Sequence, residues 1–388
     1  MFKVVKAQTV SLLLTLGVLV CVFGPAAAAV RFEGQVQAGG DPLAKSTVTL
    51  WGASAAEPSQ LAQTRTDSDG RFLISSEASI TDVMLYLTAE GGEVKGSGNN
   101  PAVAFLSVLG NTPIGTVVIN EMTTVASVWT HAQFLEGTGI KGHELGLKIA
   151  AGNVPSFVNR QTGGWGAAIQ DPLNSGQTPT MANFATLADL LSGCATRVTA
   201  DACNKLFAAS TPQRGSAPSD TLTAAQSIAR YPWYMPVRLF ALLGEFYPVP
   251  AGKNLRPVPF MPYLNFSPSA WVLPLKFDGG GYRAGGKAMF DSEGNLWVGD
   301  NFTVGWQGQD AIWQGNAAKF DPNGMPLSPI TTGFAGGGMQ GGTFGAAVDQ
   351  NDNAWLSSYG RKSIAVFDKN GKPLTTARKA LPSMVGLA

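Results

Sequence analysis

The sequence predicts a multidomain, mainly β protein with a small helical domain at its centre, and three observations carry that prediction. Charged residues make up only 14% of the 388 residues, whereas 47 glycines and 24 prolines favour strands and turns. Short alternating segments recur in the first third, helix-spaced apolar residues fill the middle, and a four-strand unit repeats near the end. A chain of this length exceeds what one core usually serves, so two or three domains are expected.

Residues 1–29 have the layout of a secretory signal peptide. Lys3 and Lys6 precede an apolar run at 10–23, and small residues follow it. The run is shorter than the about 20 residues that a membrane-spanning helix needs. We therefore expect cleavage after Ala29, no membrane span in the mature chain, and a secreted, periplasmic or cell-surface location. The alternative is an uncleaved N-terminal anchor.

Residues 30–119 predict an antiparallel β-sandwich, because short alternating segments lie between turn residues. The turn chemistry of Asp67 to Gly70 predicts a hairpin that joins two of these segments. The expected strands are 30–36, 47–51, 61–66, 71–74, 84–89, 103–108 and 116–119.

Four strings in this region, at 32–36, 41–43, 46–50 and 64–72, resemble the carboxypeptidase-regulatory-like, or transthyretin-like, sandwich of exported bacterial proteins. The resemblance implies a structural or adhesive module. It brings no catalytic residues with it.

Residues 120–250 predict a small helical domain with one disulfide. Helix-spaced apolar residues start at Met122 and again before Cys194, Asp220 is placed as an N-cap, and 235–246 is apolar. Cys194 and Cys203 remain after removal of the leader, and export would carry them into an oxidising compartment, so we expect them to pair. This arrangement resembles the helical insert of secreted bacterial proteins that continue into NHL-type propellers. Prolines crowd 251–266 and predict a linker without regular helix.

Residues 267–388 contain two copies of one pattern. The segment 288–298 matches 346–356 with an offset of 58, as from Asp291 to Asp349. The segment 318–327 matches 365–374 with an offset of 47, so the first copy holds 11 extra residues, expected around 307–315. Each copy predicts four strands with an Asp-led tight turn in each of its two hairpins.

This repeat resembles the blades of NHL-type and streptogramin-lyase-like β-propellers, which implies a partial propeller of about two blades. A propeller needs at least four blades of about 40 residues. We therefore expect the chain to be a truncated product, with assembly of partial propellers between chains as the alternative. The in-register Trp297 and Trp355 are predicted to pack between blades. Streptogramin lyases act through histidine and glutamate beside a metal, but His131 and His143 lie in the helical region, so that chemistry is not carried over.

The composition excludes several partners. Basic and acidic residues, 27 and 26, nearly cancel without a basic stripe, so no nucleic acid is expected. Two cysteines lack the further ligands of a zinc site, and the Asp-led turns lack the closing Glu of a calcium loop, so no metal and no cofactor are expected.

The predicted function is therefore that of an exported, non-catalytic binding or scaffold protein, which presents its sandwich and propeller surfaces to a protein or a carbohydrate. The alternative is a lyase- or lactonase-like propeller enzyme whose catalytic blades are missing from this chain. Two glycine-rich loops at one end of the predicted propeller are candidate ligand-facing segments. Their residues are Gly279, Gly281, Gly285, Gly336, Gly338 and Gly341.

Overall fold

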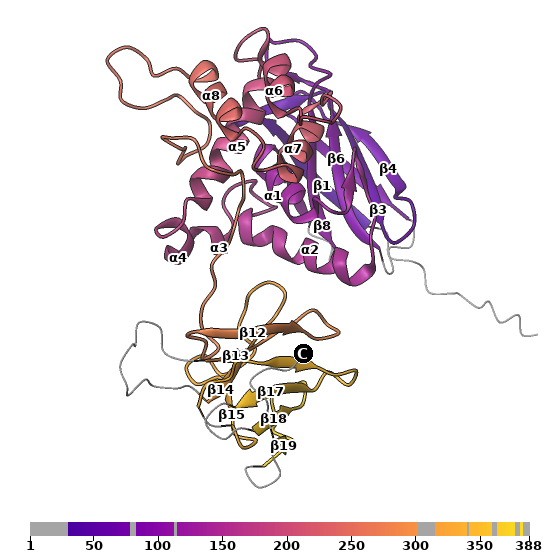
Figure 1. Cartoon of the computed structure of the whole chain (residues 1–388). Helices are drawn as coiled ribbons and strands as arrows, with labels where there is room; N and C mark the ends of the chain where they lie inside the picture. The colour runs from indigo at the N-terminus through magenta and orange to yellow at the C-terminus, as the bar shows by residue number, and fades with distance from the viewer. Residues whose placement is uncertain are drawn as a thin grey trace, which may run out of the picture.

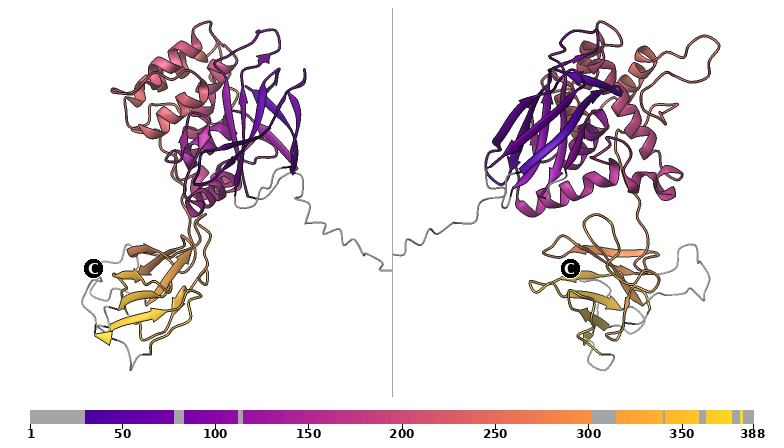
Figure 2. Two further views of the ribbon diagram at one scale, coloured as in Figure 1. Left: turned by 90° about the vertical axis from the view of Figure 1, so that its right-hand side faces the viewer. Right: turned by 180° about the vertical axis from the view of Figure 1, so that it is seen from behind.

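The computed structural model describes residues 30–77, 83–111, 115–301, 315–339, 341–358, 363–376 and 381–382. They form an N-terminal body of sheets and helices (30–246), an irregular strap (247–284) and two C-terminal sheets (285–382), as Figures 1 and 2 show. The predicted signal peptide and nearly all of the predicted insertion at 307–315 lie outside the described residues. Within the described ranges, no helix has the length and apolar character needed to cross a bilayer.

Two sheets build the strand half of the N-terminal body. One has the order β5-β1-β2-β7 with β9 against β1, and the other has the order β4-β3-β6-β8. Their strands are β1 Val30–Ala38, β2 Asp41–Ala44, β3 Thr47–Ala53, β4 Ser59–Arg65, β5 Arg71–Ser76, β6 Met84–Glu90, β7 Glu93–Val94, β8 Ala104–Gly110 and β9 Thr116–Ile119.

The two sheets share one core. Phe32 on β1, Leu50 on β3 and Leu87 on β6 are fully buried in a single cluster that draws on both sheets. Strand β5 alternates strictly between exposed and buried residues, as expected for a strand with one solvent-exposed face. Each buried Leu or Phe side chain contributes about 1.5–3 kcal/mol through the hydrophobic effect.

Two details of the strand predictions were wrong. The turn from Asp67 to Gly70 forms, with Asp67 Oδ1 accepting hydrogen bonds from the backbone N–H groups of Asp69 and Arg71 at 2.8 and 2.9 Å. However, β4 and β5 do not form a hairpin, because β4 pairs with β3 and β5 pairs with β1. The first sheet is also not wholly antiparallel, since β9 runs parallel to β1.

The helices cover the outer face of β6 and β8 (Figure 1). Tyr86 and Leu106 belong to the same core cluster as Met122 and Val125 of α1, so 30–119 and 120–250 share a core. Both faces of β8 are thereby covered, and every residue of this strand is buried. The helices and short strands are α1 Glu121–His131, β10 Leu135–Glu136, β11 Gly139–Ile140, α2 Glu144–Phe157, α3 Ala167–Gln170, α4 Pro172–Ser175, α5 Thr180–Ala195, α6 Ala202–Ser210, α7 Thr221–Arg230 and α8 Pro236–Phe246.

The predicted N-cap of α7 is confirmed. Asp220 accepts a hydrogen bond from the Thr223 N–H at 2.8 Å, and its own N–H donates to the Thr223 hydroxyl at 3.2 Å. This reciprocal pair is a capping box, which satisfies N–H groups that the helix itself leaves unpaired. Asn120 and Thr123 make the same box at the start of α1.

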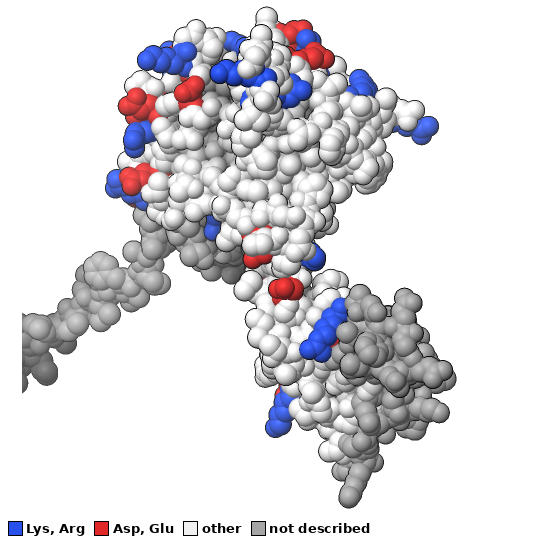
Figure 3. Space-filling model, turned by 90° about the vertical axis from the view of Figure 1, so that its left-hand side faces the viewer, with Lys and Arg blue, Asp and Glu red and all other residues white. Residues whose placement is uncertain are grey.

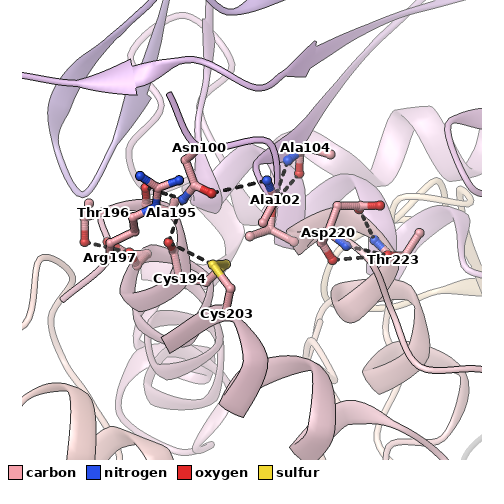
Figure 4. The surroundings of a disulfide bond; sticks show 12 residues. Asn100, Ala102, Ala104, Cys194, Ala195, Thr196, Arg197, Cys203, Asp220 and Thr223 are labelled. Carbon is pink, nitrogen blue, oxygen red and sulfur yellow. Dashed lines mark hydrogen bonds between the residues drawn. A yellow bond between two sulfur atoms is a disulfide. The ribbon is translucent and has the colours of Figure 1, made fainter. Parts of the chain in front are cut away.

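The predicted disulfide between Cys194 and Cys203 is confirmed (Figure 4). Cys203 lies in the first turn of α6. Asn100, on the loop between β7 and β8, donates to the backbone carbonyls of Cys194 and Ala195 at 2.9 and 3.1 Å. The end of α5 is therefore held both to α6 and to the strand half of the body.

Replacing Cys203 by Ser should lower the free energy of unfolding of the N-terminal body by about 2–3 kcal/mol, because the nine-residue link no longer restricts the unfolded chain. Urea unfolding of the oxidised wild type and the variant measures the difference. Dithiothreitol should destabilise the wild type and leave the variant unchanged. Equal stability of oxidised wild type and variant would contradict the prediction.

The strap contains no helix or strand, as its prolines predict, but it packs on the helices instead of running free. Trp271 is fully buried, and its carbonyl accepts a hydrogen bond from Trp129 Nε1 at 2.9 Å. The Leu264 N–H donates to the Thr186 hydroxyl at 2.9 Å. The strap is thus part of the helical core rather than a spacer.

The C-terminal residues form two four-stranded antiparallel sheets, which confirms the four-strand unit that the repeat predicts. The register also repeats: Asn316 pairs with Ala335 in the first sheet, and Ser363 pairs with Pro382, 47 positions later, in the second. The first C-terminal sheet comprises β12 Gly285–Phe290, β13 Leu296–Asp300, β14 Asn316–Phe320 and β15 Phe334–Ala335. The second comprises β16 Ala346–Val348, β17 Ala354–Ser358, β18 Ser363–Phe367 and β19 Leu381–Pro382.

The Asp-led turns follow one geometry. In each turn the Asp Oδ1 accepts from the backbone N–H groups two and four positions later, at 2.8–3.1 Å. Each of these carboxylates therefore holds its own hairpin in shape.

Candidate binding face

The two C-terminal sheets pack face to face around Trp297. This side chain is fully buried among Ala346, Leu356 and Phe367 of the second sheet. Phe334 adds a tilted ring contact, with centroids 5.6 Å apart. The prediction that Trp297 packs between the units is confirmed.

A buried ion pair lies beside Trp297. Lys319 Nζ is 2.9 Å from Asp291 Oδ2 and 4.9 Å from the Trp297 ring centroid. It also donates to the Lys369 carbonyl of the second sheet at 2.8 Å. Burial raises the pKa of Asp291, but hydrogen bonds from Asn295 and Lys319 outweigh that effect and leave the pKa below its ordinary value. Asp291 is therefore charged when paired.

The second sheet differs from this arrangement in one residue and in one hydrogen bond. Val366 stands where the first sheet has Lys319, and Asp349 Oδ2 accepts from Trp355 Nε1 at 2.9 Å instead. The hydrogen bonds from Trp355 and Asn353 lower the pKa of Asp349 to about 2. Trp355 is only half-buried, so it does not share the packing of Trp297.

The side of the first C-terminal sheet that faces away from the second sheet is apolar and only partly covered, because its β12 edge is exposed whereas Val298, Ala318 and Phe320 are buried, and we call it the open face. Its residues are Ala288, Phe290, Leu296, Val298, Ala318 and Phe320. Their repeat partners are Ala346, Val348, Ala354, Leu356, Ala365 and Phe367. Those partners form the side of the second sheet that packs against Trp297. The two sheets thus carry matching apolar sides, of which one is covered by protein and the other is exposed along β12.

The open face is hollow. A cavity of about 450 Å³ lies over it, with Val298 and Phe320 in its base and Phe290 at its exposed edge. Phe290 is 68% exposed, and every residue of β12 except Gly286 is exposed. Tyr282 of the strap closes one side, edge-on to Phe320 with centroids 6.2 Å apart. Among the described residues around the hollow, all except Asp321 are uncharged.

Helix α2 reaches the turns at one end of the open face and leaves β12 uncovered. Asn153 Nδ2 donates to the Pro322 carbonyl at 3.1 Å, and Ile149 lies against Gly294. These contacts involve the turn after β12 and the turn after β14. The strap and α2 therefore border the hollow, and the β12 side remains accessible.

The predicted loop glycines lie in turns that pack on their own sheets. Gly279 to Gly281 and Gly336 to Gly338 have the same sequence of positive φ angles, 97°, 64° and 75° against 104°, 64° and 88°. Ser328 donates to the Gly280 carbonyl at 2.9 Å, and Thr375 donates to the Gly337 carbonyl at 2.7 Å. A Cβ on Gly281 would lie 2.1 Å from the Gly333 nitrogen, so this position requires glycine.

The other predicted loop glycines, Gly285 and Gly341, are also absent from the lining of the hollow. The structure therefore brings none of the six predicted glycines to the open face. Sequence reasoning missed the open face itself, although the repeat offsets identify each of its residues once one sheet is known to cover the other.

The surface view in Figure 3 shows uncharged residues in the majority, with positive and negative side chains scattered over the N-terminal body. Neither histidine approaches the open face. His131 is buried in α1 with Nδ1 3.0 Å from the Ser127 carbonyl, and burial lowers its pKa to about 4. His143 caps α2, where its Nδ1 accepts from the Leu145 N–H.

No family model and no curated protein matches this chain. Among solved structures, the chain is similar to a 9R-lipoxygenase from Cyanothece PCC8801. The identity is 21%, and the match covers 25% of this chain and 17% of the lipoxygenase chain, with a TM-score of 0.18. A TM-score this low carries no argument about fold or function.

Proposed function

We propose that this chain is an exported, non-catalytic binding and scaffold protein whose open face binds another protein. One observation carries the proposal: the open face has the same apolar residues, in the same register, as the side of the second sheet that is buried against protein. The open face has the residue pattern of a sheet side that is covered by protein, yet its Phe290 is exposed to solvent. Such an exposed apolar surface indicates an interaction site.

The architecture belongs to the same proposal. The two N-terminal sheets are a transthyretin-like sandwich, and the two C-terminal sheets are neighbouring blades of a β-propeller. The sequence resemblances support this assignment, as do the repeated four-strand units with their Asp-led turns. The leader at 1–29 directs the chain out of the cytoplasm, and the disulfide is consistent with that destination.

The chemistry of the hollow favours a protein over a carbohydrate. A sugar presents many hydroxyl groups and needs several convergent polar partners, whereas Asp321 is the one charged side chain among the described residues that line this hollow. An apolar side chain from a partner protein would instead remove water from Ala288, Phe290 and Leu296 without burying a polar group of the hollow.

Photo-crosslinking tests the proposal. With p-benzoylphenylalanine in place of Phe290, irradiation of the producing cells should give a protein adduct that mass spectrometry identifies. The control places the same group at Leu73, which is 49% exposed on β5, and should give no such adduct. Replacing Leu296 by Asp in the crosslinking chain should abolish the adduct. No adduct from residue 290, or one that persists with Leu296→Asp, would refute the proposal.

A further inference from the structure

The partner of the open face can be inferred from the internal repeat. We propose that the open face of one chain is covered by the outer side of the second C-terminal sheet of another copy, so that chains associate head to tail. The inference rests on the proposed function and names its partner.

The contact between the two sheets of one chain is the template. There, Trp297 and Ala317 of the first sheet pack against Leu356 and Phe367 of the second. The equivalents of Leu356 and Phe367 in the first copy of the repeat are Val298 and Phe320. Both of these lie on the open face. The open face therefore fits the outer side of a sheet of this same kind.

The second C-terminal sheet supplies that outer side. Trp355 occupies the position of Trp297, and Ile364 and Val366 occupy those of Ala317 and Lys319. This side is more apolar than its counterpart, because Val366 replaces the lysine. Trp355 is half-exposed and held by Asp349, as expected of an aromatic residue that anchors a contact.

This contact is heterologous, since it joins different surfaces of two identical chains. Such contacts continue until a ring closes or a filament grows. The two described C-terminal sheets of one chain would then be continued by those of the next chain. The β12 side of the hollow is accessible, but at the turn end the Ile149 side chain of α2 lies where Gln350 of the other copy would approach Gly294, so association requires this side chain to move aside.

Engineered cysteines test the register. Within one chain, Ser292 donates to the Asp352 carboxylate through its N–H and its hydroxyl, at 2.8 and 2.6 Å. The equivalent pair between copies is Gln350 of one chain and Gly294 of the other. A mixture of Gly294→Cys and Gln350→Cys chains should therefore form a disulfide-linked dimer on a non-reducing gel. Asp352 already has a positive φ of 59° in the position of Gly294. A Cβ at Gly294 would lie 2.5 Å from the end of the flexible Ile149 side chain and 3.5 Å from Pro322, so the variant is accommodated when Ile149 changes its rotamer.

The matched control mixes Gly294→Cys with Ser68→Cys, which is exposed on the N-terminal body, and should give no dimer. Sedimentation velocity provides the second measurement, in which the wild type should form concentration-dependent oligomers at micromolar concentration. Phe290→Asp should weaken association about tenfold or more, whereas Leu73→Asp, another exposed apolar residue, should not change it.

The results separate this inference from the proposed function. A wild-type chain that stays monomeric at about 100 µM and gives no mixed-cysteine dimer would overturn head-to-tail association. If residue 290 then still crosslinks to a different protein, the proposed binding function stands and only its partner is wrong. If residue 290 crosslinks to nothing, both fail.

Discussion

Raising the pH from about 4.5 to about 8 is expected to lower the free energy of unfolding of the N-terminal body by about 3–5 kcal/mol. Two buried carboxyl groups cause this. Burial raises the pKa of Glu121 from 4.5 to about 7 and that of Asp189 from 3.8 to about 8. The Glu121 charge also contributes to the shift at Asp189.

The direction of the effect follows from proton binding. A carboxyl group whose pKa is raised in the fold binds its proton more tightly when folded, so its stabilisation is complete below the unfolded pKa and is lost as the pH rises through the folded pKa. His131 acts oppositely, because its pKa is lowered from 6.5 to about 4, and its contribution grows between those values. The steepest loss of stability is therefore expected above pH 6.5.

The geometry explains why both groups are held in the core. Glu121 Oε1 accepts from the Gly39 N–H at 2.8 Å, which joins α1 to the turn after β1. Asp189 Oδ1, on α5, accepts from the Phe260 N–H of the strap at 3.0 Å. Tyr247 lies beside both carboxyl groups, and burial raises its pKa in turn.

Urea unfolding across pH 4.5 to 8 measures the effect. Glu121→Gln and Asp189→Asn should each flatten the pH dependence, since the amide keeps an acceptor and cannot ionise. Glu144→Gln is the matched control, because Glu144 also opens a helix next to its N-cap but is exposed. A wild type whose stability is constant between pH 6.5 and 8, or a Glu121→Gln protein that keeps the full slope, would contradict the expectation.

Replacing Lys319 by Val is expected to destabilise the C-terminal sheets by about 3–5 kcal/mol, because it leaves the Asp291 carboxylate buried without its cation. The contact of Lys319 with the Trp297 ring is lost as well. The second sheet shows that valine itself fits this position, since Val366 occupies it there. The cost therefore lies in the unpaired charge rather than in the shape of the side chain.

A double variant separates these causes. Asp291→Asn combined with Lys319→Val should recover most of the stability, and chemical unfolding of the wild type and the three variants gives the coupling energy. Lys372→Val, in an exposed turn of the second sheet, should change stability by less than about 0.5 kcal/mol. If Lys319→Val is as stable as the wild type, the pair has no structural role.

Local pattern predicted most elements of the N-terminal body. Every strand expected from alternation is present, whereas β2 and β7 were missed because strands of four and two residues are too short to alternate. Helix α2 was missed because it contains Pro155 and two glycines, which count against a helix. Burial of Leu147 and Val154 in the shared core outweighs that cost.

Local sequence patterns could not predict which strands pair with each other across the sheets. The turn chemistry at Asp67 is satisfied whether or not the flanking strands pair, so it could not reveal that β4 and β5 belong to different sheets. The repeat was more informative, because its offsets fix even the register of β15 and β19. It could not show which side of a sheet is uncovered, since that depends on a neighbour and not on the sheet.

The attachment of the strap has a mechanical consequence. Tension applied to the C-terminal sheets enters the N-terminal body through Lys276, whose N–H donates to Asn174 Oδ1 at 2.6 Å, and then reaches Trp271 and Leu264 in succession. These bonds are loaded one after another, as in peeling, instead of together, as in shear. An assembly under strain would therefore yield by stepwise lengthening of its tethers before any sheet is torn apart.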